Sequence, residues 1–266
     1  MSSTSTSTPL TLRGKVALVS GSSTGIGAAI AQELAKRGAS VVINFPRSAE
    51  KEDADKVLST LPAESKSVAI EADLSTTTGP EALVQQVVAV FGRIDILVNN
   101  AGLMLGHSLD DPDDAKVIGL INKMMDLNGR GTYLLTRAVL KHLSNQNSRI
   151  VNITSGSSRT PGVGVSMYAG TKGMIESFTR SWAKELPRRY GCTVNAVAPG
   201  VVGTEAYYAA PATVRELLKP MIDETPIAPR VARPEEIAWA TAMLCEEGAG
   251  WINGIYLPVG GGSTMN

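Results

Sequence analysis

The sequence contains little cysteine, few aromatic residues and no excess of charge of either sign. Its two cysteines, Cys192 and Cys245, exclude a disulfide-rich secreted domain and do not have a metal-ligand spacing. The 25 basic residues balance the 25 acidic residues, so no extended electric field draws the chain to nucleic acid or anionic lipid. We therefore expect a small-molecule substrate, with neither a nucleic-acid nor a membrane partner.

Long apolar runs and targeting segments are also missing. No run of about 18 apolar residues is present that could span a bilayer. Residues 1–9 form a Ser/Thr-rich tract that lacks the apolar run of a signal peptide and the arginines of a transit sequence. This pattern predicts a cytoplasmic protein with a disordered tail at residues 1–9. His107 and His142 are isolated from any third ligand at suitable spacing, so we expect no metal site.

What the sequence does contain is an alternation of apolar runs and helix-like patterns. Expected strands occupy residues 15–20, 40–44, 67–71, 94–99, 149–154 and 192–197, and expected helices occupy residues 24–37, 80–91, 115–143 and 165–185. Such alternation is typical of a parallel sheet covered by helices on both faces. With 43% hydrophobic residues and no dividing linker after Pro9, the chain can bury one large core. The prediction is an α/β fold: one doubly wound, Rossmann-type domain over residues 10–266.

One segment departs from this alternation. Residues 206–233 hold four prolines, the adjacent tyrosines Tyr207 and Tyr208, and a moderately amphipathic stretch. Such an irregular excursion is expected over the edge of the sheet, where loops carry binding functions. We predict that residues 206–233 form a substrate lid.

A glycine-rich turn joins the first expected strand to the first expected helix. It contains Gly21, Ser23, Thr24, Gly25, Ile26 and Gly27. Glycine permits a tight turn, and the N–H groups and partial positive charge of a helix N-terminus favour a pyrophosphate. Because the spacing is not the standard G-x-G-x-x-G, the turn alone is equally compatible with a structural turn or a methyltransferase-type nucleotide site. Ile30, Leu34 and Ala35 are expected to face the sheet.

A sharper pattern lies downstream, where Ser155 precedes Tyr168 by thirteen residues and Lys172 follows Tyr168 by four. Residues four apart share one face of a helix. A lysine ammonium near a phenol favours the phenolate, which lowers the tyrosine pKa toward working pH, and a serine hydroxyl can bond a substrate oxygen. A tyrosine and a lysine at this spacing often occur by chance on a solvated helix face. Their combination with Ser155 and the glycine turn predicts carbonyl reduction, with Tyr168 as proton donor and acceptor.

Taken together, residues 12–262 resemble the short-chain dehydrogenase/reductase family, and in particular ketoreductases of its 3-oxoacyl reductase-like type. The family's glycine motif is matched at residues 20–27, its Asn-Asn-Ala-Gly at residues 99–102 and its Tyr-x-x-x-Lys at residues 168–172. The family commonly has an acidic residue before two glycines near the end of the chain, where this sequence has Val259 instead. That departure leaves the C-terminal contacts open.

The resemblance implies further roles. Asn128 would hold a water that links Lys172 to solvent, although a buried amide bonded to backbone is an alternative. The remaining cofactor contacts implied by the resemblance are Asp73 and Leu74 beside the adenine, Asn100, Ala101 and Gly102 under the cofactor together with Tyr168 and Lys172, and Pro199, Gly200, Val202 and Thr204 at the nicotinamide carboxamide. A strand-end cap is the alternative for Asp73.

The end of the second expected strand favours NADP(H) over NAD(H). An NAD enzyme of this fold usually carries an acidic residue there, which would repel a 2′-phosphate. Here the position holds Asn44, and Arg47 and Ser48 follow with a cation and a hydroxyl. Against this, the glycine turn carries Thr24 where many NADP(H)-binding relatives have a basic residue, and Arg47 can equally be a solvated loop arginine.

Side chains expected near the substrate are mostly apolar: Leu103, Met104, Gly156, Val163, Met167, Tyr207 and Tyr208. They favour a hydrophobic or aromatic ketone, although a β-keto thioester or a steroid also fits. A non-catalytic dinucleotide sensor of the same fold and a nucleotide-binding transferase are alternatives. The first commonly lacks the tyrosine or lysine kept here, and the second leaves Ser155, Tyr168 and Lys172 unexplained. Family resemblance also implies a homotetramer.

Overall fold

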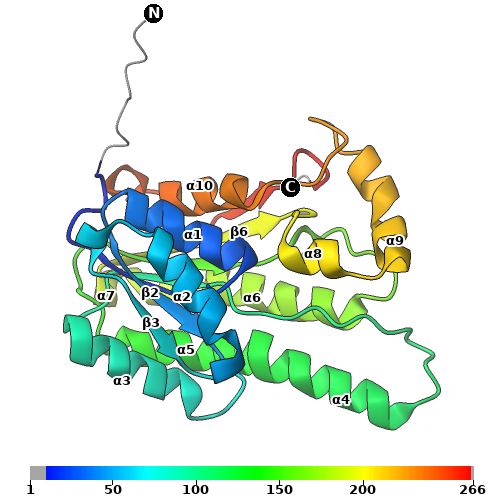
Figure 1. Cartoon of the computed structure of the whole chain (residues 1–266), viewed down its shortest axis with the longest axis horizontal. Coiled ribbons are helices and arrows are strands. Elements are labelled where there is room, and N and C mark those ends of the chain that lie inside the picture. The colour runs from blue at the N-terminus through cyan, green and yellow to red at the C-terminus, as the bar shows by residue number, and fades with distance from the viewer. Residues whose placement is uncertain (1–9, 265–266) are drawn as a thin grey trace, which may run out of the picture.

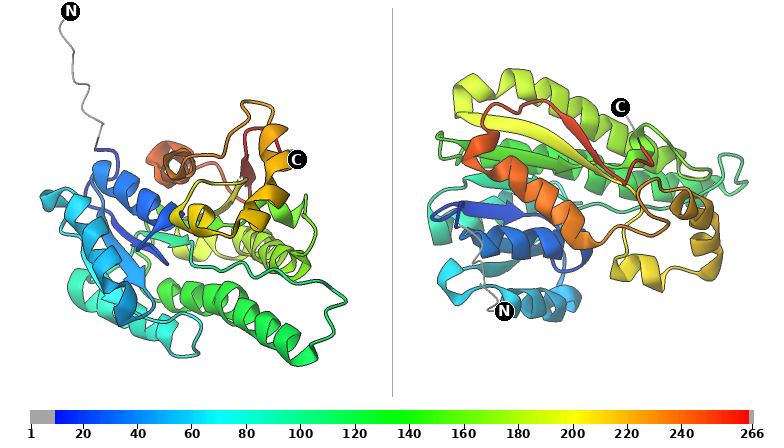
Figure 2. Two further views of the ribbon diagram at one scale, coloured as in Figure 1. Left: turned by 45° about the vertical axis from the view of Figure 1, so that its right-hand side comes forward. Right: turned by 90° about the horizontal axis from the view of Figure 1, so that it is seen from above.

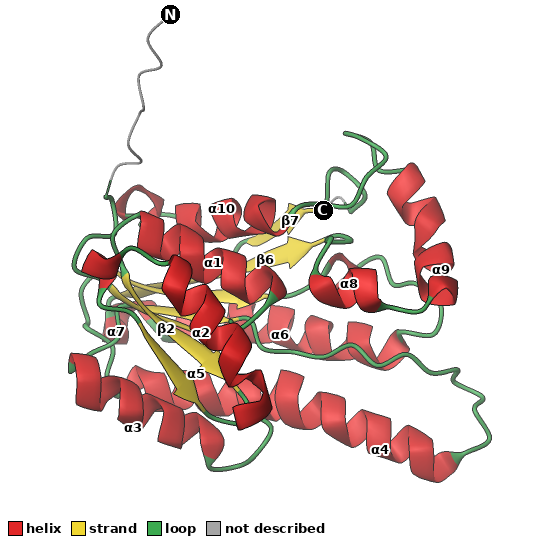
Figure 3. Cartoon of the chain, viewed as in Figure 1, coloured by secondary structure: helices red, strands yellow, loops and turns green. Residues whose placement is uncertain are grey.

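The computed structural model describes residues 10–264, so the predicted disordered tail at residues 1–9 lies outside the described residues. Within them, parallel strands form one sheet (Figure 3). The strand order is β3-β2-β1-β4-β5-β6-β7. The strands are β1 (Val16–Val19), β2 (Ser40–Phe45), β3 (Val68–Glu71), β4 (Ile96–Asn99), β5 (Ser148–Ile153), β6 (Cys192–Pro199) and β7 (Tyr256–Val259). This order confirms the predicted doubly wound sheet in a single domain.

Helices cover both faces of the sheet (Figures 1 and 2). On one face pack α1 (Gly25–Lys36), α2 (Lys51–Thr60) and α10 (Pro234–Cys245). On the other face pack α3 (Gly79–Phe91), α5 (Thr132–Leu140) and α6 (Ser166–Glu185). The remaining α-helices are α4 (Asp114–Met124), α7 (Pro187–Tyr190), α8 (Glu205–Ala209) and α9 (Ala212–Asp223), and short 3-10 turns are η1 (Ser48–Glu50), η2 (Ala63–Ser65), η4 (Gly156–Ser158) and η5 (Glu247–Ala249).

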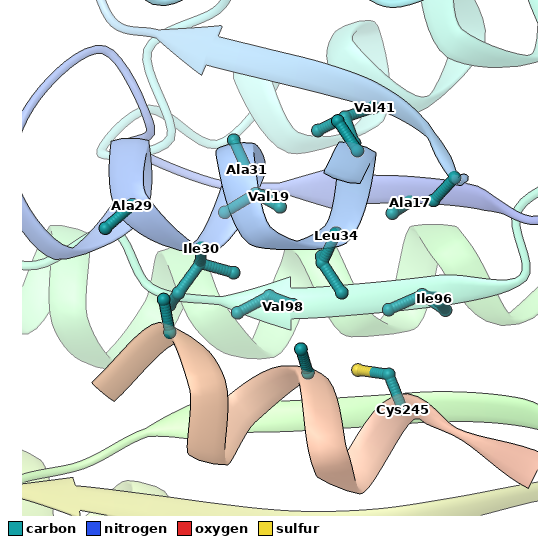
Figure 4. Close-up of a cluster of buried hydrophobic side chains, with 14 of the residues drawn as sticks. Ala17, Val19, Ala29, Ile30, Ala31, Leu34, Val41, Ile96, Val98 and Cys245 are labelled. Carbon is teal, nitrogen blue, oxygen red and sulfur yellow. The ribbon is translucent and has the colours of Figure 1, made fainter. Parts of the chain in front are cut away.

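The core under α1 explains why this segment is a helix on the sheet. Ile30 and Leu34 lie four residues apart on one face, and both are fully buried against β1, β4 and α10 (Figure 4). Ala35 is buried beside them, as the sequence predicted. This packing fixes the direction of α1 and therefore the position of the glycine turn at its start.

The long helix predicted over residues 115–143 is divided. It begins as α4, widens into a π-helix, η3 (Met125–Gly131), continues as α5 and ends at Leu140. At Gly131 the backbone passes so close to β3's continuation that an added Cβ would lie 2.5 Å from the Leu74 carbonyl oxygen. A π-turn inserts an extra residue and often marks a functional site. Here it contains Asn128.

Parallel strands bring their carboxyl ends to one edge of the sheet, and the predicted site residues follow these ends. The direction in which the chain adds strands to the sheet reverses between β1 and β4: β2 and β3 follow on one side of β1, and β4 to β7 follow on the other side. Ligands of open α/β sheets bind at this switch point. Helices α8 and α9 lie beyond the same edge of the sheet (Figure 1). Both fall almost entirely within the predicted lid, residues 206–233.

Candidate active site

The glycine turn after β1 is tied to the segment after β4. Gly21 has a φ of +58°, a left-handed conformation that favours glycine. The Asn100 side chain donates hydrogen bonds to the carbonyls of Ser20 (2.9 Å) and Gly21 (2.8 Å). In return, the Ser20 hydroxyl accepts from the backbone N–H groups of Asn100 and Ala101, each at 3.0 Å. These reciprocal bonds give the turn a defined shape beside the switch point.

The atoms around Gly27, at the start of α1, leave no room for a side chain at this position. A Cβ built there lies 2.3 Å from the Gly21 carbonyl oxygen and 2.5 Å from Asn100 Nδ2. We predict that Gly27→Ala displaces the turn and weakens dinucleotide binding at least tenfold, measured by fluorescence titration. The matched control is Gly119→Ala in α4, where an added Cβ meets nothing within 4 Å and helix propensity favours alanine. If Gly27→Ala binds NADPH as tightly as Gly119→Ala does, Gly27 is not needed for binding.

The N-terminus of α1 already holds an anionic group. Thr24 at the N-cap makes no side-chain capping bond, and the Gly25 N–H instead donates to a carboxylate oxygen of Glu205 at 3.1 Å. Glu205 begins α8, and its neighbour Thr204 lies so close to Gly25 that an added Cβ on this glycine would be 3.3 Å from Thr204 Cγ2. The helix N-terminus therefore binds an anionic group, as expected, but that group is the carboxylate of Glu205 in α8.

Asn44 shapes the turn from within the sheet. Its side chain is 2% exposed, accepts a hydrogen bond from the Gly21 N–H (3.1 Å) and donates to the carbonyls of Ile70 and Ala72. Since both its oxygen and its nitrogen are used by backbone groups, the amide acts by positioning Gly21.

Arg47 and Ser48 lie on the surface after β2. The Arg47 side chain is 76% exposed, and its Nε contacts Glu50 at 3.1 Å. A surface ion pair of this kind is weak enough to exchange for a ligand phosphate.

Asp73, which follows β3, is also exposed, and its carboxylate accepts hydrogen bonds from the N–H and hydroxyl of Ser75 at 2.8 and 2.7 Å. The turn-capping alternative for Asp73 is therefore present, while Leu74 is buried in the core.

Asn128, Gly102 and Lys172 meet below the carboxyl ends of β4 and β5. Asn128 is completely buried; its Oδ1 accepts from the Leu103 N–H at 2.9 Å, and its Nδ2 donates to the Leu103 carbonyl and the Thr171 hydroxyl. A Cβ on Gly102 would lie 3.3 Å from both Asn128 Oδ1 and Lys172 Nζ. The side-chain amide of Asn128 therefore fixes the backbone after β4, which matches the alternative of a buried amide.

Lys172 is 4% exposed and donates to the Ile153 carbonyl at 2.9 Å. Burial lowers the pKa of Lys172 from 10.5 to about 8. Its Nζ lies 5.9 Å from the centroid of the Tyr168 ring. The helix thus brings the tyrosine and the lysine onto one face, as their spacing predicted.

The predicted lowering of the Tyr168 pKa is wrong for this structure. Burial raises the pKa of Tyr168 above its ordinary value of 10.0, and a hydrogen bond with the Ser155 side chain opposes that rise only in part. The ammonium of Lys172 lies 5.9 Å from the ring centroid and bonds the Ile153 carbonyl, and desolvation of the phenol is the largest influence on the Tyr168 pKa. At neutral pH Tyr168 therefore carries its proton, which is the form that donates.

The loop after β6 closes the site opposite Ser155. Gly156 approaches Pro199 so closely that an added Cβ would lie 3.4 Å from the Pro199 carbonyl oxygen. Gly200 packs against Gly260 after β7, which supplies the C-terminal contact that the sequence left open. Val202 is buried, and the Thr204 hydroxyl caps α8 by accepting from the Tyr207 N–H at 3.3 Å. The structure therefore brings the four predicted residues of this loop to the same edge as Ser155 and Tyr168.

Several residues that contact this site were not predicted. Glu205 reaches Gly25, Thr171 holds Asn128, and Tyr256 donates to the Ser155 carbonyl at 3.2 Å. Ser20 and Thr171 lie within the matched motifs at residues 20–27 and 168–172, so their position could have indicated them. Glu205 and Tyr256 lie far along the chain and carry no local signal.

Comparison with known proteins identifies the family. The family model described as "Enoyl-(Acyl carrier protein) reductase" matches residues 21–264. The chain is 40% identical to "Short-chain dehydrogenase/reductase FrzI" of Cladobotryum sp., covering 96% of this chain and 97% of that protein. The chain belongs to the short-chain dehydrogenase/reductase family. It is an oxidoreductase of this family.

Two further relatives carry more specific names. "Hydroxynaphthalene reductase arp2" of Aspergillus fumigatus is 36% identical, with 94% of this chain and 93% of that protein covered. The solved structure of "angucycline C-6 ketoreductase LanV with bound NADP" is 28% identical, has a TM-score of 0.85 and covers 96% of this chain and 98% of that one. The family resemblance drawn from the sequence, including its ketoreductase-like character, is therefore confirmed.

Two general properties complete the description. Among the described residues, no helix is both long and apolar enough to cross a membrane. The same residues contain no group of three or more His, Cys, Asp or Glu side chains that could hold a metal ion.

Proposed function

We propose that this oxidoreductase uses NADP(H) to reduce a hydrophobic or aromatic ketone to a secondary alcohol, or to catalyse the reverse reaction. The observation that carries the proposal is the joint placement of Ser155, Tyr168 and Lys172 at the sheet edge that also holds the glycine turn. When bound, the nicotinamide supplies or accepts the hydride. Side chains at Gly21 and Gly27 would clash with Ala101, Asn100 and the turn itself, so bare backbone is needed to keep the turn in the shape that would bind a dinucleotide.

The chain's own groups provide the proton chemistry. The Tyr168 hydroxyl, protonated at neutral pH, would donate its proton to the substrate oxygen as negative charge develops there. The Ser155 hydroxyl would hold that oxygen. The buried Lys172 ammonium, within 5.9 Å of the phenol ring, would stabilise the phenolate that remains. Asn128, which lies in the π-helix, would hold a water molecule that links Lys172 to solvent and so completes a route for the proton.

The cofactor contacts are proposed for the residues named from the sequence, with the role of Asn44 refined and Glu205 added. Asn44 would act through Gly21, and Glu205 would have to yield the Gly25 N–H to a phosphate or share it. The pyrophosphate would be lined by Ser23, Thr24 and Ile26, and Asn100, Ala101 and Gly102 would lie under the cofactor. The adenine would contact Asp73 and Leu74, and the carboxamide would contact Pro199, Gly200, Val202 and Thr204.

Preference for NADP(H) rests on Arg47. The end of β2 carries Asn44 in place of an acidic residue, and the exposed Arg47 guanidinium would be available to bind a 2′-phosphate. We predict that Arg47→Ala weakens NADPH binding about tenfold, because one exposed charge-assisted contact is lost, and leaves NADH binding unchanged. Parallel fluorescence titrations with both cofactors measure this. An equal loss for NADH, or none for NADPH, would contradict the role of Arg47.

The proposed substrate class is supported by the apolar side chains that the sequence placed near the substrate. Met104, Val163 and Tyr208 are 51%, 102% and 61% exposed, and α9 in the lid buries none of its residues. Such exposed apolar surface fits an apolar ligand that the lid covers. The relatives named for hydroxynaphthalene and angucycline chemistry support an aromatic ketone.

A panel assay tests the proposal. NADPH absorbance is followed with bicyclic aromatic ketones, a β-keto thioester, a steroid ketone and an enoyl thioester, since the matching family model is described as an enoyl reductase. Turnover of aromatic ketones supports the proposal. Tight NADPH binding without turnover of any carbonyl would favour the non-catalytic sensor. Turnover of the enoyl thioester alone would make carbon–carbon double-bond reduction the activity.

Assembly and location complete the proposal: a homotetramer in the cytoplasm. The ring of Tyr133 is 47% exposed and packs against Phe178 at a centroid distance of 5.6 Å, which leaves an aromatic surface on α5 and α6 that a second copy could cover. Analytical ultracentrifugation decides between a tetramer and a monomer, and cell fractionation decides the compartment.

A further inference from the structure

The backbone of Ser155 is held from two sides by side chains that lie outside the proposed catalytic set. The Ser155 carbonyl accepts hydrogen bonds from the hydroxyls of Ser158 (2.8 Å) and Tyr256 (3.2 Å). The Ser155 side-chain oxygen accepts from the Ser157 N–H at 3.1 Å, which caps the short turn η4. The direction of the Ser155 hydroxyl toward Tyr168 therefore depends on where this turn is placed.

Tyr256 is itself fixed by a charge. The Arg159 guanidinium lies over the Tyr256 ring, 3.7 Å from its centroid, and Tyr256 is 7% exposed on β7. A guanidinium at this distance from an aromatic face is attracted by the ring quadrupole. Arg159 Nη2 also pairs with Glu176 Oε1 at 2.8 Å. The ring of Tyr256 is thus held in an orientation that points its hydroxyl at Ser155.

Glu176 connects this arrangement to the helix that carries the acid/base pair. It follows Lys172 by four residues on α6, so both lie on one helix face. Its carboxylate also lies 3.2 Å from the Ser158 hydroxyl, whose single proton it shares with the Ser155 carbonyl, and it pairs with Arg180 at 2.6 Å. Burial raises the pKa of Glu176, but these hydrogen bonds and the Arg159 charge outweigh it and lower the pKa, so the carboxylate is charged at neutral pH.

We propose that Tyr256, Arg159 and Glu176 form a positioning cluster that sets the Ser155 hydroxyl against Tyr168. The cluster links β7, the η4 turn and α6. Its Tyr256 hydroxyl contacts the Ser155 carbonyl oxygen directly, and Glu176 contacts the Ser158 hydroxyl that bonds the same oxygen. The inference rests on the proposed function, since it assigns these residues a part in the same reaction. None of the three acts on the substrate.

Tyr256→Phe is the sharpest test because it removes only the hydroxyl and keeps the ring under Arg159. We expect kcat for ketone reduction to fall about three- to tenfold, the effect of one hydrogen bond, while the Kd for NADPH stays unchanged. Glu176→Gln, which removes the charge and keeps the size, should act in the same direction. The matched control is Tyr190→Phe, where Arg189 also lies over the ring, 5.2 Å from its centroid, but outside this cluster. That variant should keep the wild-type kcat.

A double-mutant cycle separates positioning from a general loss of stability. In a Ser155→Ala background, Tyr256→Phe should change the residual kcat by less than twofold, because the hydroxyl it positions is gone. If the two effects multiply instead, or if Tyr256→Phe lowers only the thermal stability, the proposal is wrong.

A readout that needs no substrate keeps the test independent of the proposed function. In protein labelled with ¹³Cζ-tyrosine, the Tyr168 resonance is assigned by its loss in Tyr168→Phe. Tyr256→Phe should shift the Tyr168 resonance, and Tyr190→Phe should not. An unchanged resonance would overturn the positioning role, whereas a shift without turnover of any ketone would leave positioning intact and reject the proposed reaction.

Discussion

Replacement of Tyr168 by phenylalanine is expected to reduce kcat for ketone reduction by roughly 10²- to 10⁴-fold, the usual contribution of a positioned general acid. The substitution removes one oxygen from a ring whose surroundings are otherwise unchanged. Binding of NADPH should stay within about threefold of wild type, because the phenol contributes its proton mainly to the reaction. Steady-state kinetics and fluorescence titration on the same preparation measure both quantities.

Tyr190→Phe serves as the control, since it removes the same atom from α7, before the amino end of β6 and away from the carboxyl edge. A Tyr168→Phe enzyme that retains more than a tenth of wild-type kcat would show that another group donates the proton. If NADPH binding were lost as well, the hydroxyl would belong chiefly to the cofactor site.

Replacement of Lys172 by methionine is expected to change both the rate and the pH dependence of stability. Burial lowers the Lys172 pKa from 10.5 to about 8. Between these two values the unfolded chain binds one proton more than the folded chain, so the Lys172 contribution to the free energy of unfolding rises with pH. At about 1.4 kcal/mol per pH unit, the total rise is about 3 kcal/mol, and Lys172→Met should lack it.

Urea denaturation of both proteins at pH 8 and pH 10.5 measures this difference. Burial raises the thiol pKa of Cys192 to about 11 and that of Cys245 to about 12, and these groups lower stability as pH rises above 9. They are common to both proteins and cancel in the comparison. An equal pH dependence of unfolding in wild type and Lys172→Met would show that Lys172 titrates normally.

The same substitution should affect catalysis at lower pH. The wild-type rate of reduction is expected to fall as pH rises through about 8, where the Lys172 ammonium loses its charge and no longer stabilises the Tyr168 phenolate. Lys172→Met should be about 10²-fold slower at pH 7 and should lack this limb of the pH profile. A wild-type profile that is flat from pH 7 to 9.5 would exclude the ammonium from the rate-limiting step.

Much of the fold could be predicted from the sequence because its strands are continuous apolar runs. Six of the strands and the start of α1 lie within a few residues of their expected places, since burial on both faces leaves a clear signal. Helix α2 was not placed, because its sequence KEDADKVLST buries only Ala54 and Val57 and shows little apolar periodicity. No local pattern marked the π-helix at Asn128, whose residues contact Leu103 and Leu74, 25 or more positions away in the sequence.

The candidate site likewise contains some features that the sequence predicted and others that it did not. Local motifs predicted the helical spacing of Tyr168 and Lys172, and the family resemblance placed Asn128 near them. The direction of the Tyr168 pKa shift depends on how deeply the ring is buried, which no spacing reveals, and the prediction was wrong. Long-range partners such as Glu205 at Gly25 and Tyr256 at Ser155 required the three-dimensional arrangement.

Transfer of deuterium from NADPH labelled at the transferable position of its nicotinamide ring tests the central claim most directly. The acceptor is a bicyclic aromatic ketone such as 1-tetralone, and the product is examined by mass spectrometry and NMR. We predict that one deuterium appears on the carbinol carbon of the alcohol, and that Tyr168→Phe suppresses its formation. Absence of label in the alcohol from every ketone of the panel, although NADPH binds, would contradict the proposed hydride transfer.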